Sequence, residues 1–73
     1  MQTASVNMTR DGVLVAPGQV WRDLDKRVLR TVTVERVSDG TAFVVSSING
    51  ARTRIAIRRM HKYGQGFELV SSP

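Results

Sequence analysis

The stretch that decides the fold runs from Arg30 to Met60 and reads RTVTVERVSDGTAFVVSSINGARTRIAIRRM. β-Branched residues dominate it, and such residues fit the pleated, half-buried backbone of a strand. Two turn sequences divide it, Asp39-Gly40 and Asn49-Gly50, and both dipeptides are strong short-range signals for a β-hairpin. We therefore predict three consecutive antiparallel strands over residues 30–37, 41–47 and 52–58.

The turns also predict which side chains are buried. A two-residue turn at Asn49-Gly50 sets Val44 opposite Ile55, and a three-residue loop over 38–40, with Gly40 left-handed at a bulge, sets Val34 opposite Val44. A two-residue Asp39-Gly40 turn would instead set Glu35 opposite Val44 and so place a charged side chain on the buried face of the sheet. Because opposed residues share a face, both chosen turns predict one inner face. It consists of Val32, Val34, Ala42, Val44, Ile55 and Ile57.

The outer face follows by alternation and carries most of the polar side chains of the meander. It consists of Thr31, Thr33, Glu35, Phe43, Val45, Arg52, Arg54, Ala56 and Arg58. The orientation of Phe43 is left open, because burying its ring would be favourable by roughly 1.5–3 kcal/mol and would compete with an outward orientation.

Turns and charge divide the chain before the meander. Residues 1–12 are polar and predict a flexible N-terminal tail. Residues 13–70 predict one folded β domain, in which Val13–Val15 is a candidate short edge strand and Gln19–Arg22 is the first strand of the body. The charged loop Asp23–Leu29 follows that strand.

A break in the strand pattern precedes the last strand. Residues 58–64 predict a short 3-10 turn, and residues 66–70 predict a strand with Phe67 and Leu69 pointing inward. Residues 71–73 are expected to fray. The whole chain is therefore expected to be all-β, with five strands.

This order of elements resembles a Src-homology-3 (SH3)-type barrel, with Asp23–Leu29 in the place of its long first loop. KOW and Tudor modules share the plan. The resemblance spans about residues 17–70 and implies a small five-stranded SH3-like barrel, an arrangement that hides strand edges otherwise prone to aggregation. Because this fold carries many unrelated functions, it implies no activity.

A narrower resemblance concerns small proteins of unknown function encoded by actinobacterial phages. Three segments carry it: Pro17-Gly18-Gln19-Val20-Trp21-Arg22-Asp23, Arg52-Thr53-Arg54-Ile55 and Gly66-Phe67-Glu68-Leu69-Val70. The resemblance implies a phage or prophage origin and a bacterial cytoplasm, and it implies no site.

Length and composition exclude several classes of protein. The 73 residues predict a single domain. The chain has no cysteine, which excludes disulfides and thiolate metal sites and fits a reducing compartment. No apolar run approaches the roughly 18 residues of a membrane helix, and residues 1–16 lack the basic and apolar regions of a signal peptide. We expect a cytoplasmic protein without membrane contact, and the sequence leaves its oligomeric state open.

Catalysis is not expected. His61 is the only histidine and has no carboxylate near it in sequence, which excludes an ordinary metal site as well. Asp23 and Asp25 resemble a paired acid–base site, but pairing within their loop, with Lys26 and Arg27, is the more economical interpretation. No glycine-rich phosphate loop precedes a helix. We therefore expect no catalytic residue, no metal and no cofactor.

Positive charge is the main functional signal. Eleven Lys and Arg residues stand against six Asp and Glu residues, and all the basic residues except Arg10 and Lys62 lie between Arg22 and Arg59. On strand alternation, arginines of the third strand share one face, and the following turn extends the stripe. We predict a nucleic-acid-binding stripe of Arg52, Arg54, Arg58, Arg59 and Lys62.

Two aromatic residues are candidates for stacking on unpaired bases or for contacting a partner, namely Trp21 and Phe43. For Trp21 the alternative is a core position beneath the first loop. For the arginines the alternative is a solvated face whose side-chain stems cover apolar surface. The partner is DNA or RNA in the first hypothesis. In the second it is an acidic host protein or a component of a virion.

Overall fold

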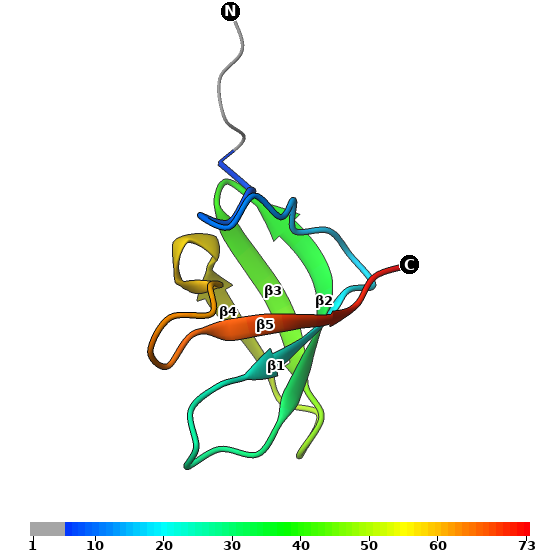
Figure 1. Cartoon of the computed structure of the whole chain (residues 1–73). Coiled ribbons are helices and arrows are strands. Elements are labelled where there is room, and N and C mark those ends of the chain that lie inside the picture. Colours follow the sequence, from blue (N-terminus) through cyan, green and yellow to red (C-terminus); the bar gives the residue numbers. More distant parts are fainter. Residues whose placement is uncertain (1–5) are drawn as a thin grey trace, which may run out of the picture.

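The computed structural model describes residues 6–73 and shows one antiparallel sheet of five strands (Figure 1). Its elements are β1 (Val20–Asp23), β2 (Thr31–Ser38), β3 (Thr41–Ser46), β4 (Arg52–Ala56), the 3-10 turn η1 (Ile57–Arg59) and β5 (Phe67–Ser71). The all-β class, the five strands and the 3-10 turn before the last strand are thus confirmed.

The sheet order β4-β3-β2-β1-β5 leaves β4 and β5 at its two ends. In Figure 1 the β1–β5 end of the sheet crosses in front of β3, so the two halves of the sheet face each other. Within residues 6–73 no ladder joins β4 to β5, so hydrogen bonding does not close the sheet into the expected barrel. The turn η1 and residues 60–66 lie between these strands in the chain and separate them.

The predicted inner face is confirmed, since all six of its residues are buried: Val32, Val34, Ala42, Val44, Ile55 and Ile57. Trp21 of β1 and Phe67 of β5 pack against them from the other half of the sheet, and Met60, directly after η1, completes that side. Leu69 is partly buried against the same cluster. Strand alternation therefore identifies the core correctly.

The turn between β2 and β3 differs from the prediction. Ser38 pairs with Thr41, so the turn has two residues, Asp39 and Gly40, and both have positive φ, as a type I′ turn requires. The ladder then shifts between Val34 and Arg36. This bulge at Glu35 returns Val34 to its place opposite Val44, so the Glu35 side chain does not have to lie on the buried face.

The turn between β3 and β4 also differs. Val44 lies opposite Thr53 rather than Ile55, and the Ser46 N–H donates to the Ala51 carbonyl oxygen at 2.9 Å, so residues 47–50 form a four-residue loop. The register has moved by two positions. An even shift keeps every side chain on its face, which is why Ile55 is still buried.

The described part of the predicted tail contacts the sheet. Residues 6–12 return as a small hairpin, in which Met8 bridges Leu14 and the Val15 N–H donates to the Asn7 carbonyl oxygen at 2.9 Å. The Asn7 side-chain oxygen also accepts the Gly40 N–H at 2.8 Å, which ties the hairpin to the β2–β3 turn. The remainder of the predicted tail, residues 1–5, lies outside the described residues.

Gly66 is required by close approach of backbone to backbone. A Cβ atom at this position would overlap the His61 carbonyl oxygen, which accepts the Phe67 N–H at 2.8 Å. We expect Gly66→Ala to lower the free energy of unfolding by about 1–3 kcal/mol in urea denaturation, because that hydrogen bond must break or the loop must move. Gln65→Ala, at an exposed neighbour, is the control. Equal midpoints for the two variants would contradict this packing.

Candidate nucleic-acid interface

Three adjacent strands bring two arginines next to one aromatic residue. Phe43 of β3 lies opposite Arg54 of β4 and opposite Arg36 of β2. The Arg36 guanidinium carbon is 4.0 Å from the centroid of the Phe43 ring, a cation–π contact. Phe43 is half-buried on the outer face, so the register of the sheet and the guanidinium cover together account for its outward position.

Arg36 is the residue that sequence reasoning missed. Regular alternation would turn it to the face opposite Glu35, whereas the bulge leaves both Glu35 and Arg36 exposed and turns Val37 toward the core. The signal was present in the sequence, because a two-residue Asp39-Gly40 turn can keep Val34 opposite Val44 only if β2 contains one extra residue.

Together, Arg36, Phe43, Arg52 and Arg54 form what we call the arginine groove. The groove has a volume of ≈ 590 Å³, and Glu35 and Thr53 also line it. The Arg52 Nε–H donates to Glu35 Oε1 at 3.1 Å, so this arginine is partly neutralised. Arg54 has no ion pair with any residue in 6–73. The groove therefore offers unpaired positive charge beside an aromatic surface.

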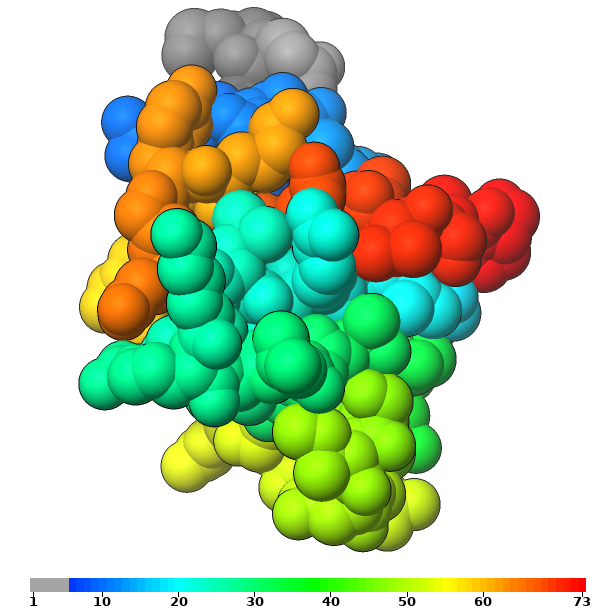
Figure 2. All heavy atoms as spheres, turned by 60° about the horizontal axis from the view of Figure 1, so that its bottom comes forward, coloured from blue at the N-terminus to red at the C-terminus, as the bar shows by residue number. Residues whose placement is uncertain are grey.

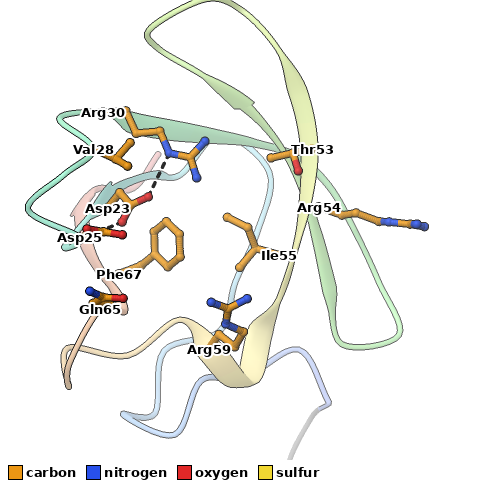
Figure 3. A pocket seen from close by; sticks show the side chains of 10 residues that line it. All are labelled: Asp23, Asp25, Val28, Arg30, Thr53, Arg54, Ile55, Arg59, Gln65 and Phe67. Atoms are coloured by element: carbon orange, nitrogen blue, oxygen red, sulfur yellow. Dashed lines mark hydrogen bonds and ion pairs between the residues drawn. The ribbon is translucent and has the colours of Figure 1, made fainter.

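The other predicted site residues do not continue this surface. Arg59 of η1 points into a second cavity, whereas Arg54 points away from that cavity (Figure 3). Lys62 lies next to the N-terminal hairpin, where its backbone N–H donates to Asp11 Oδ2 at 3.4 Å. Arg58 is exposed and lines neither cavity. The single stripe expected from the sequence is thus divided, because a 3-10 turn rotates successive side chains through a third of a circle.

Trp21 lies in the core. Its side chain is 2% exposed, and its indole N–H donates to Gln19 Oε1 at 3.2 Å. No ring face is open to a base or to a partner, which corrects the inclusion of Trp21 among the contact residues. The β1–β5 pairing explains this, since it sets Trp21 opposite Leu69 on the side of the sheet that faces the core.

The second cavity, which we call the cleft, has a volume of ≈ 340 Å³ and lies between the 24–30 loop and η1. Figure 3 shows Arg30 and Arg59 reaching into it from two sides, with the Phe67 ring and the Ile55 side chain between them. Residues 24–30 lie at the end of the molecule that is turned forward in Figure 2.

The two aspartates of the loop are both engaged. Asp23, whose side chain is 8% exposed, accepts the Arg30 Nε–H at 3.0 Å on Oδ2 and the Asp25 N–H at 2.9 Å on Oδ1. Asp25 accepts two side-chain N–H groups of Arg27, at 3.1 and 3.0 Å. Pairing within the loop is therefore what the structure shows: Arg27 pairs as expected and Arg30 pairs in addition. The expected partner Lys26 forms no ion pair with any residue in 6–73.

The single histidine is engaged in a local hydrogen bond. His61 Nδ1 accepts the Tyr63 N–H at 3.2 Å. Among residues 6–73, no three His, Cys, Asp or Glu side chains gather closely enough to hold a metal ion. In the same range, no helix has the length and apolar character needed to cross a membrane.

Comparison with protein-family models, with curated proteins and with solved structures gave no match for this chain. Its function is therefore inferred from the chemistry of its own surface.

The Asp25–Arg27 pair generates a prediction for NMR titration. Hydrogen bonds from the Arg27 side chain and backbone lower the pKa of Asp25. We expect the Asp25 carboxyl signal to titrate below the ordinary aspartate range and to move toward that range in Arg27→Ala. Because the folded pKa is depressed, the pair contributes stability above the unfolded pKa and loses it as pH falls through the folded value.

The matched control is Lys26→Ala, which removes the adjacent positive charge without removing a hydrogen bond to Asp25. A titration that moves equally in both variants would show that loop charge in general, rather than the paired geometry, sets the pKa.

Proposed function

We propose that this chain is a non-enzymatic accessory protein that binds nucleic acid through the arginine groove with little sequence specificity. The observation that carries the proposal is the stacking of Arg36 on Phe43, with Arg54 opposite Phe43 on the adjacent strand β4 and lining the same groove. Guanidinium groups match phosphate oxygens in geometry, and aromatic faces stack on bases irrespective of their identity. The two features occur together in single-strand-binding proteins.

The net charge of +5 supports attraction of a polyanion from a distance. The groove itself lies on exposed side chains of three strands, and it includes neither a helix that would enter the major groove nor a set of convergent amide side chains. Contacts of arginine with phosphates position a protein without reading sequence. Weak sequence preference is the expected consequence.

The architecture supports an SH3-like assignment as part of this proposal. A loop follows β1, a three-strand meander follows the loop, and a 3-10 turn precedes β5. The phage origin and the bacterial cytoplasmic location come from the sequence resemblance and belong to the same proposal. Because this fold carries many unrelated functions, the arginine groove, rather than the fold, carries the functional argument.

A second candidate function is docking on a protein, which one surface favours. Leu29 is 89% exposed and Ile48 is 60% exposed. The segments that carry them, residues 24–30 and 47–50, lie at the end of the molecule turned forward in Figure 2. The Ser47 N–H donates to the Thr31 carbonyl oxygen at 2.8 Å, which holds the two loops together. Retention of a protein partner from nuclease-treated host lysate by the wild type, and its loss in Leu29→Ser/Ile48→Ser, would favour this function.

The nucleic-acid proposal is tested by removing the groove charges. We expect Arg36→Ala/Arg52→Ala/Arg54→Ala to bind oligonucleotides at least about tenfold more weakly at low salt. The slope of log affinity against log salt should fall by about 2, since each phosphate contact contributes roughly 0.7–0.9. Fluorescence anisotropy at several salt concentrations measures both quantities, and circular dichroism checks the fold.

The control is Arg22→Ala/Lys26→Ala/Arg27→Ala, which removes the same charge from exposed positions outside the groove. Nearly wild-type affinity is expected for this variant. If the two triple variants lose affinity equally, net charge rather than the groove binds the ligand. If the wild type binds neither DNA nor RNA at low salt, the proposed function is wrong.

A further inference from the structure

The cleft on the other side of β4 brings two guanidinium groups to one cavity. Asp23 holds Arg30 through its Nε–H at 3.0 Å, which fixes the side chain and leaves its two terminal amino groups outside that ion pair. Figure 3 shows these amino groups directed into the cleft. Arg59 reaches in from η1 and forms no ion pair with any residue in 6–73. Two guanidinium groups that point into the same cavity are suited to binding an oxyanion.

The cleft is larger than an oxyanion and has apolar walls. Its ≈ 340 Å³ lies at the lower end of the range of ligand pockets, which is about 300–1,000 Å³. Val28, Ile55 and Phe67 provide apolar contact, and Gln65 provides an amide at the rim. Two carboxylates also line the cleft, and each is held in an ion pair, Asp23 with Arg30 and Asp25 with Arg27. A ligand that matches both features carries a negative charge next to a planar ring whose faces are apolar. One nucleotide has this composition.

β4 connects the cleft to the arginine groove. Thr53 and Arg54 line both cavities, and Arg54 points toward the groove side. β4 is also the last strand of the sheet, so within residues 6–73 no neighbouring strand blocks a chain that passes around its edge. A single strand is flexible enough to follow that path, whereas a duplex, with a persistence length of about 150 base pairs, resists so sharp a bend and would contact one side.

We propose that the cleft receives one unpaired nucleotide of the strand held by the arginine groove, so that the ligand is single-stranded DNA or RNA. This inference rests on the proposed function and adds a second contact site to it. Phe67 and Ile55 contact the base, Arg59 and Arg30 contact its edge or the adjoining phosphate, and Asp23 positions Arg30. Unstacked bases are commonly bound in this way, between apolar walls and guanidinium planes.

The test compares an oligothymidylate of about 12 nucleotides, an oligouridylate of the same length and a duplex of matched length by fluorescence anisotropy. For the wild type we expect the single strands to bind at least about fivefold more tightly than the duplex, the gain of one stacked base. Arg59→Gln should abolish that preference. Arg58→Gln, an exposed neighbour in η1 that does not line the cleft, removes the same charge and should keep it.

The outcomes separate the two proposals. Equal affinity of the wild type for single strand and duplex, or equal effects of Arg59→Gln and Arg58→Gln, would overturn the role of the cleft and leave binding at the groove intact. Loss of binding in Arg36→Ala/Arg52→Ala/Arg54→Ala would support the groove in either case. Failure of the wild type to bind any of the three probes would overturn the proposed function and the cleft with it. The oligouridylate distinguishes an RNA preference from a DNA preference.

Discussion

The packing of the sheet depends on a β-bulge in β2, where Glu35 has no partner on β3. The Asp39-Gly40 turn has two residues, and a continuous ladder from that turn would set the carboxylate of Glu35 against Val44 in the core. Burying an unpaired carboxylate costs far more than interrupting a ladder, so the strand bulges at Glu35 instead. The two-residue turn sets Arg36 opposite Phe43, and the bulge beyond that pair keeps Val32 and Val34 buried while Glu35 stays exposed. Core and candidate interface therefore depend on the turn and the bulge together.

The sequence predicts which face of the sheet a residue occupies better than it predicts which residue lies opposite it. Ile55 is assigned correctly to the core, although its partner across the ladder is Ala42 rather than Val44. Faces depend only on whether a residue number is odd or even along a strand, so a register error of two positions leaves them unchanged. Cross-strand partners depend on loop length, and Asn49-Gly50 did not predict a four-residue loop.

The candidate site is less predictable than the core for the same reason. Arg52 and Arg54 are on the strand, and alternation places them together. Arg59 belongs to η1, where the period of two no longer holds, and its side chain enters the cleft on the other side of β4. The cleft itself joins Arg30 from before β2 with Phe67 from β5. No local pattern brings such distant residues together, because their proximity is a property of the sheet as a whole.

Arginines on an edge strand have a second explanation that does not involve a ligand. Charged side chains on an edge discourage pairing with other chains, and β4 is an edge. That role accounts for Arg52 and Arg54, but it gives no reason for Arg36, which lies on β2, two strands away from the edge. Nor does edge protection require a half-buried phenylalanine between the charges, since an exposed aromatic ring promotes the association that edge charges prevent. Edge protection therefore leaves the Arg36–Phe43 contact unexplained, and this contact is the reason for proposing a binding role.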